Sequence, residues 1–146
     1  MRKLNTAGFT IVELMIVIGI LVVIAATASP LFGNLNNNSQ LDAARDILVQ
    51  DLYQAQTFSR NRSRDTSWGV AVNGQVITLF SGTSYAARDT ASDIVYTVPS
   101  AITLSGSSQI VYSKLYGLPT TTGSFGFTTK GKTATVTINS KGMVEY

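Results

Sequence analysis

The chain of 146 residues contains neither cysteine nor histidine. Without cysteine it has no disulfide framework and no thiolate metal ligand. Without histidine it lacks the commonest general base, the commonest metal ligand and any Ser-His-Asp arrangement. Asp89 and Asp93 lie close together in one predicted loop, but two acids are too few to define a calcium site. The sequence therefore predicts no enzyme activity, no cofactor and no metal site.

Charged residues are also scarce, at 13% of the chain. The formal net charge is +3, and Arg2 and Lys3 supply two of the 11 positive side chains. Removal of residues 1–8 leaves nine positive side chains against eight acidic ones. The basic balance thus belongs largely to the first eight residues, and it is weak evidence for a nucleic-acid partner.

Residues 9–29 form an apolar segment in which Glu13 is the one charged residue. A helix of about 20 residues crosses the core of a bilayer. Two positive charges precede the segment and the next one follows only at Arg45, which predicts a cytoplasmic N-terminus and an external C-terminal part. Residues 26–28, Ala-Thr-Ala, also match a small-x-small cleavage site, so a cleaved secretory signal is a competing interpretation.

Glu13 is the unusual feature of this segment, because a carboxylate at mid-membrane depth costs about 2.5–3.5 kcal/mol. A cut between Gly8 and Phe9 would create an α-amino cation four residues before Glu13. Each of these two groups would then have an opposite charge to pair with on a neighbouring helix. The carboxylate would also suit the positive end of the helix dipole. The alternative is that Glu13 extends towards the lipid headgroups.

This pattern resembles the class III signal of type IV prepilins and type II secretion pseudopilins, over about residues 1–33. The resemblance implies cleavage after Gly8 by a prepilin peptidase and N-methylation of Phe9. It implies that Glu13 neutralises the Phe9 amine of a neighbouring subunit and sets the axial register. It also implies a helix kink at Pro30, the position of a kinking proline in the family.

Residues 30–38 are poor in helix formers, with Gly33 and four asparagines. They predict a flexible neck between the membrane segment and a globular domain. An amphipathic helix is then predicted over residues 39–59, with Ser39 as its N-cap. Its apolar stripe contains Leu41, Ala44, Leu48, Leu52 and Ala55, and its polar face contains Arg45, Asp46, Gln50, Asp51 and Gln54.

From Trp68 onwards the hydrophobic period changes to two. Asn73-Gly74 lies between two alternating runs and predicts a hairpin with a type I′ turn. Further strands are predicted at 93–98, 101–104, 109–112, 124–129, 133–139 and 142–146. The prediction is an α+β domain over 39–146, in which the helix 39–59 covers one face of an antiparallel sheet within 67–146.

The C-terminal part resembles the H-type minor pseudopilins and FimT-like minor pilins (the GspH/FimT group). Residues 68–72 resemble their first strand, and residues 127–131 and 138–144 resemble their paired strand–glycine motifs. Met143 stands where that group often has an arginine. The resemblance implies the pilin-like fold: a long membrane-spanning N-terminal helix that continues into an amphipathic helix packed on an antiparallel sheet.

The first functional hypothesis is a structural subunit of a type IV pilus or a type II secretion pseudopilus, and a minor one by the resemblance. Residues 1–8 would be its leader and residues 9–29 its transmembrane and assembly helix. The chain would enter the bacterial inner membrane with its domain outside, and then join an extracellular or periplasmic filament. Its implied partners are other pilin subunits, the prepilin peptidase and an assembly platform with its ATPase.

Two other hypotheses remain. One is a minor pilin that captures DNA for uptake through Arg60, Arg62, Arg64, Lys130, Lys132 and Lys141. A simpler interpretation of the three arginines is that they favour the negative end of the preceding helix. The other hypothesis is a secreted or simply anchored β-rich domain. Type IV pilus, type II secretion and competence machines all fit the same N-terminal pattern.

Overall fold

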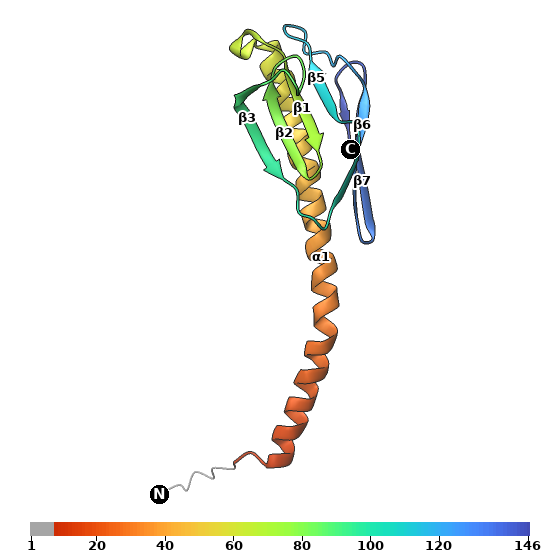
Figure 1. Ribbon diagram of the computed structural model, residues 1–146. Coiled ribbons are helices and arrows are strands. Elements are labelled where there is room, and N and C mark those ends of the chain that lie inside the picture. Colours follow the sequence, from red (N-terminus) through yellow and green to blue (C-terminus); the bar gives the residue numbers. More distant parts are fainter. Residues whose placement is uncertain (1–7) are drawn as a thin grey trace, which may run out of the picture. The chain divides into compact units, whose positions relative to one another are not determined.

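The computed structural model describes the backbone of residues 8–146 and the side chains of residues 8–26 and 35–146. The chain divides into two compact units, Met1–Leu35 and Asn36–Tyr146. Helix α1 (Ile11–Arg60) begins in the first unit and ends in the second (Figure 1). All the strands belong to the second unit.

The backbone of residues 30–38 is helical and forms part of α1. The sequence predicted a flexible neck there, followed by a new helix capped by Ser39. No helix begins at Ser39, and the flexibility of the neck stays a prediction. Helix propagation is cooperative, so helical segments on both sides extend across a short stretch of weak helix formers. The boundary between the two units nevertheless falls inside this stretch, after Leu35. The side chain of Pro30 lies outside the described residues, and the kink assigned to it stays a prediction.

A short 3-10 helix, η1 (Ser63–Asp65), follows α1 and leads into eight strands arranged as two antiparallel sheets. The first sheet has the order β3-β2-β1-β5, and the second has the order β4-β6-β7-β8. The strands are β1 (Trp68–Asn73), β2 (Val76–Ser81), β3 (Asp89–Thr97), β4 (Thr103–Gly106), β5 (Gln109–Tyr112), β6 (Gly123–Thr129), β7 (Lys132–Ile138) and β8 (Val144–Glu145).

The α+β class is confirmed, but the single sheet of the prediction is replaced by two. The strand at 109–112 has the predicted bounds, whereas β3 begins four residues earlier than predicted. Strand β5 returns to the first sheet and pairs with β1, although β4 before it and β6 after it belong to the second. Alternating hydrophobicity indicates where strands occur, and it does not specify which strands pair.

The predicted β1–β2 hairpin is present, but its turn lies one residue further along than predicted. Asn73 pairs with Val76, so the two turn residues are Gly74 and Gln75. Of these two, Gly74 alone has a left-handed φ, at 60°. A positive φ confined to the first turn residue is the pattern of a type II′ turn and corrects the predicted type I′.

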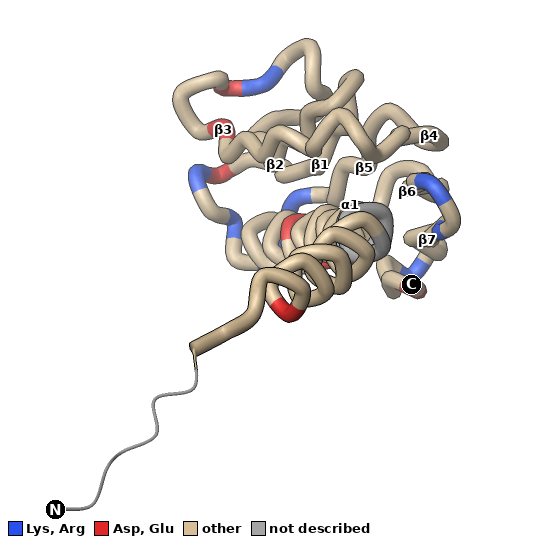
Figure 2. The backbone as a smooth tube through the Cα atoms, turned by 90° about the horizontal axis from the view of Figure 1, so that it is seen from below, with Lys and Arg blue, Asp and Glu red and all other residues tan. Residues whose placement is uncertain are grey.

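The predicted apolar stripe of α1 is confirmed, because all five of its members are fully buried. They join residues of both sheets in one core, whose buried members run along the chain from Leu41 to Val144. Burial of each large apolar side chain contributes about 1.5–3 kcal/mol. Figure 2 shows strands of the two sheets on different sides of this part of the helix. The second unit thus has a core of its own.

Asp51 departs from the prediction, since it was assigned to the polar face and is only 8% exposed. The two sheets enclose more of the helix circumference than a single sheet would. Burial disfavours the ionised carboxylate and raises the pKa of Asp51 to about 6.

Candidate functional site

The N-terminal end of α1 is closed by Thr10, the residue just before its first turn. The backbone N–H of Glu13 donates to Thr10 Oγ1 over 3.2 Å. The N–H of Leu14 donates to the backbone oxygen of Thr10, also over 3.2 Å. Thr10 is therefore the N-cap and Glu13 occupies the third helical position, which is the spacing of a capping box. The Thr-x-x-Glu pattern was a sequence signal for this cap, and the sequence interpretation missed it.

Gly8 and Phe9 precede the helix in non-helical, exposed backbone. The side chain of Phe9 is 85% exposed. No atom lies within 4 Å of the position that a Cβ at Gly8 would occupy. The predicted scissile bond is therefore accessible and lies two residues before the first helical residue, Ile11.

Every large hydrophobic side chain described from Phe9 to Ile24 is at least 46% exposed. Such side chains occupy all sides of the helix, and Glu13 is the only charged residue among them. An all-round apolar helix needs a non-aqueous or protein environment on every side. Within the described residues, no helix meets the length and hydropathy needed to cross a membrane.

The six basic residues predicted to form one patch lie towards two ends of the domain. Lys132 Nζ contacts Asp42 Oδ1 at 2.7 Å, near the start of the domain part of α1. The hydrogen bond from Lys132 holds the pKa of Asp42 below its usual value. Arg60 is the last residue of the same helix, 18 residues from Asp42, which corresponds to about 27 Å at 1.5 Å per residue. Lys130 lies in the β6–β7 turn, two residues before Lys132, so these two lysines are far from the arginines.

Arg60 and Arg62 are exposed at the end of α1. Arg60 Nε donates to the backbone oxygen of Tyr116 over 3.4 Å. Lys141 lies near this end of α1 and away from Lys132. Its neighbour Gly142 accepts a hydrogen bond through its backbone oxygen from the side chain of Gln56, which is one helical turn before Arg60. The arginines and Lys141 therefore form the more compact basic group.

Arg64 is engaged within the domain. Its Nη1 contacts Asp89 Oδ2 at 3.1 Å and also donates to the hydroxyl of Ser92. The hydroxyl of Ser92 and the N–H of Ala91 also donate to Asp89, and together with Arg64 they lower its pKa.

Asp93 is paired in the same way with Arg88, whose Nε lies 2.7 Å from its Oδ2. The two acids considered as calcium ligands are thus each partnered by an arginine. Among the described residues, no group of three or more acidic side chains is placed to hold a metal ion.

Ser59 joins the end of α1 to both β1 and β5, a role that sequence reasoning missed. Its hydroxyl donates to the backbone oxygen of Tyr112 over 3.1 Å and accepts from the N–H of Trp68 over 2.9 Å. The backbone oxygen of Ser59 accepts from the N–H of Leu115. No periodicity distinguishes this buried serine from the other polar residues of the helix, so only the contacts identify it.

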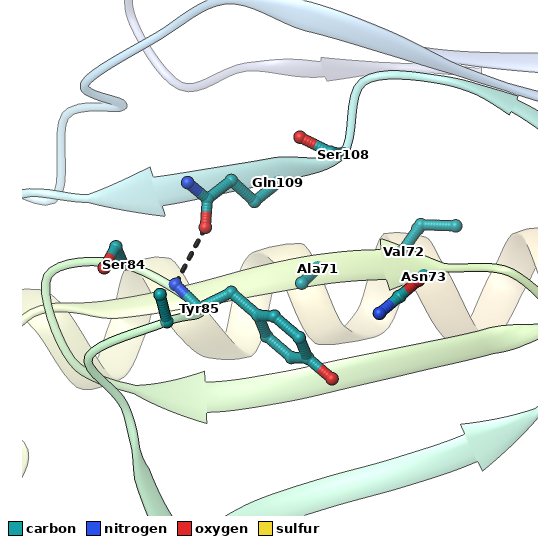
Figure 3. A pocket seen from close by; sticks show the side chains of 8 residues that line it. Ala71, Val72, Asn73, Ser84, Tyr85, Ser108 and Gln109 are labelled. Carbon is teal, nitrogen blue, oxygen red and sulfur yellow. Dashed lines mark hydrogen bonds between the residues drawn. The ribbon is translucent and has the colours of Figure 1, made fainter.

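A pocket of about 380 Å³ lies between β1, β5 and the loop after β2 (Figure 3). On one wall the N–H of Tyr85 donates to Gln109 Oε1 over 2.8 Å. The lining carries no charged group: Ala71, Val72, Asn73, Ser84, Tyr85, Ala86, Ser108 and Gln109. It contains no acid–base pair and no activated nucleophile, so we assign no reaction to it.

Residues 3–29 match the family described as the prokaryotic N-terminal methylation motif. The match includes Gly8, Phe9, Thr10 and Glu13, and it ends before the domain with the two sheets. No curated protein and no solved structure matches the chain significantly. The motif indicates a protein of the type IV pilin or pseudopilin type, processed as a prepilin.

Proposed function

We propose that this chain is a minor structural subunit of a type IV pilus or a type II secretion pseudopilus. The observation that carries the proposal is the arrangement at the N-terminus. An exposed Gly8–Phe9 bond is followed directly by a capped helix with apolar side chains on all sides and one acid, Glu13. The match to the methylation motif supports the processing step.

Cleavage after Gly8 leaves a short non-helical end, in which the Phe9 amine precedes the helix and is free to reach a neighbour. Glu13 lies in the first turn, where the helix dipole favours a carboxylate. In an apolar assembly the amine of one subunit pairs with Glu13 of the next. The loss of one partner from such a buried pair costs about 3–5 kcal/mol, so the pair selects one axial register.

The proposed path begins in the bacterial inner membrane, with the domain on the outer side. A prepilin peptidase cleaves the leader and methylates Phe9. An assembly platform and its ATPase then move the subunit into an extracellular or periplasmic filament. The subunit itself serves as a packing element and requires no bound nucleotide.

The test is the N-terminus of the mature chain, determined by mass spectrometry on protein from cells that contain a prepilin peptidase. We expect a chain that begins at Phe9 and carries one N-methyl group. The same chain from cells without the peptidase should retain residues 1–8. A mature chain that begins at Ser29 would instead support a cleaved secretory signal and would refute the proposal.

The basic group at the end of α1 supports a second candidate function, in which the minor pilin binds DNA. Arg60 and Arg62 are exposed there, and the adjacent Tyr116 is 70% exposed and offers an aromatic surface for stacking. Lys130 and Lys132 would not take part, because they lie at the other end of the domain. A gel-shift titration of residues 36–146 tests this candidate at several salt concentrations. Arg60→Ala with Arg62→Ala should abolish the shift, whereas Lys130→Ala should retain it.

A further inference from the structure

Strand β3 is an edge strand of the first sheet, and no strand among residues 8–146 pairs with its outer side. Ile94 and Val95 lie in its regular half and are 51% and 57% exposed. No other large hydrophobic side chain in a described strand is exposed to this degree. A free edge with exposed apolar side chains is a template for pairing with another chain.

The other sheet edges in the described part of the chain are short or covered. Strand β4 has four residues and β8 has two. The outer side of β5 is covered by the segment that follows it: Thr120 N–H donates to the oxygen of Val111, and Ser113 N–H donates to the oxygen of Leu118, each over 2.8 Å.

The half of β7 that β8 leaves unpaired begins at Lys132. A lysine at an edge opposes strand pairing, and this one is held by Asp42. Among the strands that the structure describes, β3 alone therefore combines free backbone groups with exposed apolar side chains.

The direction of the free backbone groups follows from one hydrogen bond. Val98 N–H donates to the oxygen of Gln75, the residue before β2, over 2.8 Å. Alternate residues of an antiparallel strand direct their backbone groups to the same neighbour. Ile94 and Tyr96 therefore face β2, and the backbone groups of Val95 and Thr97 point to the open side.

We propose that β3 pairs antiparallel with β3 of a second copy of this chain, around a two-fold axis at Val95. The pairing joins two four-stranded sheets into one. Val95 then lies opposite its own copy, and Ile94 lies opposite Tyr96. Ile94 and Tyr96 share a face of the sheet, because their partners in β2 both belong to the core. A β-branched residue opposite an aromatic one is a favourable cross-strand pair.

The charges of β3 fit a second copy. In the register centred on Val95, Asp93 lies opposite the neutral Thr97, so no two acids face each other. The carboxylate of Asp93 is already paired with Arg88 at 2.7 Å within its own chain. A register centred on Ile94 would place Asp93 opposite Val95 and is less favourable. A two-fold contact of this kind uses the same residues on both copies.

The extent of the contact is limited by the irregularity between Leu79 and Ser81 of β2, where the pairing of β3 shifts. Only the C-terminal half of β3 is regular enough to pair. We therefore expect a weak association that depends on concentration. The contact uses neither Gly8, Phe9 nor Glu13, so it is separate from filament assembly through the N-terminal helix.

Residues 36–146 can be tested alone, because this unit contains its own core. Analytical ultracentrifugation should show a mass that rises from monomer towards dimer as the concentration increases. Val95→Lys should abolish the rise. Met143→Lys is the matched control, since Met143 is 58% exposed but lies outside the strands; it should leave the rise unchanged. Circular dichroism verifies that both variants are folded. A monomer at every concentration, or association that survives Val95→Lys, would overturn the proposal.

Cross-linking gives a second measurement, because the chain has no cysteine of its own. Directly opposed residues of antiparallel strands have Cα atoms about 4.5–5.5 Å apart, within the range that a disulfide bridges. Val95→Cys should form a disulfide-linked dimer on mild oxidation. Thr103→Cys places an exposed thiol on the β4 edge and should form little. Equal yields from the two variants would contradict pairing through β3.

Discussion

The backbone N–H of Glu13 donates to the hydroxyl of Thr10, the residue that caps α1. The cap makes the helix begin two residues after the predicted cleavage site. It also places Glu13 in the first turn, where a carboxylate is favourable. The sequence predicted an assembly role for Glu13, and the structure adds that Thr10 caps the turn in which Glu13 lies.

Replacement of Thr10 by Ala should destabilise the first turn of α1 by about 1 kcal/mol. Hydrogen exchange on the mature chain in detergent micelles measures the loss of stability. Because about 1.4 kcal/mol corresponds to a tenfold change, the Glu13 N–H should exchange about fivefold faster. Thr10→Ser retains a hydroxyl and should exchange like the parent chain. Unchanged exchange in Thr10→Ala would show that the cap does not stabilise the turn.

Glu13→Ala should remove the carboxylate that the proposed assembly needs while leaving an apolar helix. We expect the variant chain to be retained with membranes but lost from filaments. Cell fractionation and quantification of sheared filaments measure the two pools. The cost of an unpaired Phe9 amine, about 3–5 kcal/mol, predicts a loss of more than a hundredfold. Incorporation at the parent level would refute the pairing.

Ser59→Ala should destabilise the domain, because it leaves the buried N–H of Trp68 without its acceptor. The expected loss in the free energy of unfolding is about 1–3 kcal/mol. Urea denaturation of residues 36–146 measures it. Ser140→Ala is a control on an exposed turn serine and should change the stability by less than about 0.5 kcal/mol.

The buried carboxyl of Asp51 predicts a pH dependence of stability. Its pKa is about 6 in the folded domain against 3.8 in an unfolded chain, so the folded state binds the proton more tightly. The resulting stabilisation is complete below pH 3.8 and is lost as the pH rises through 6. The total is about 2–3 kcal/mol, at 1.36 kcal/mol per pKa unit.

Asp51→Asn removes this dependence. As the pH rises from 4 to 8, the parent domain should therefore lose unfolding free energy relative to Asp51→Asn. Urea denaturation at a series of pH values measures the difference. Asp42, Asp65 and Asp89 have lowered pKa values, which make the stability of both proteins fall at acidic pH. This effect is the same in the parent and the variant, so it cancels from the difference between them. A difference that does not vary with pH would contradict the burial of Asp51.

The N-terminal motif was recognisable from the sequence because its residues lie close together along the chain, and the roles assigned to these residues stay predictions. Gly8, Phe9 and Glu13 belong to one short motif, and the family match covers the same residues. Thr10 was missed although its signal, a hydroxyl three residues before an acid, was present. The role of Ser59 had no such signal, since its partners Trp68 and Tyr112 are distant in the sequence.

By itself, the sequence determined the apolar stripe of α1, the β1–β2 hairpin and the processing motif. Each depends on the spacing of residues within a few turns or one short strand pair. The tertiary structure decided that the strands form two sheets, that Asp51 is buried, and that Lys132 pairs with Asp42 far from Arg60. These features depend on contacts between segments tens of residues apart, and local periodicity carries no information on which distant segments meet.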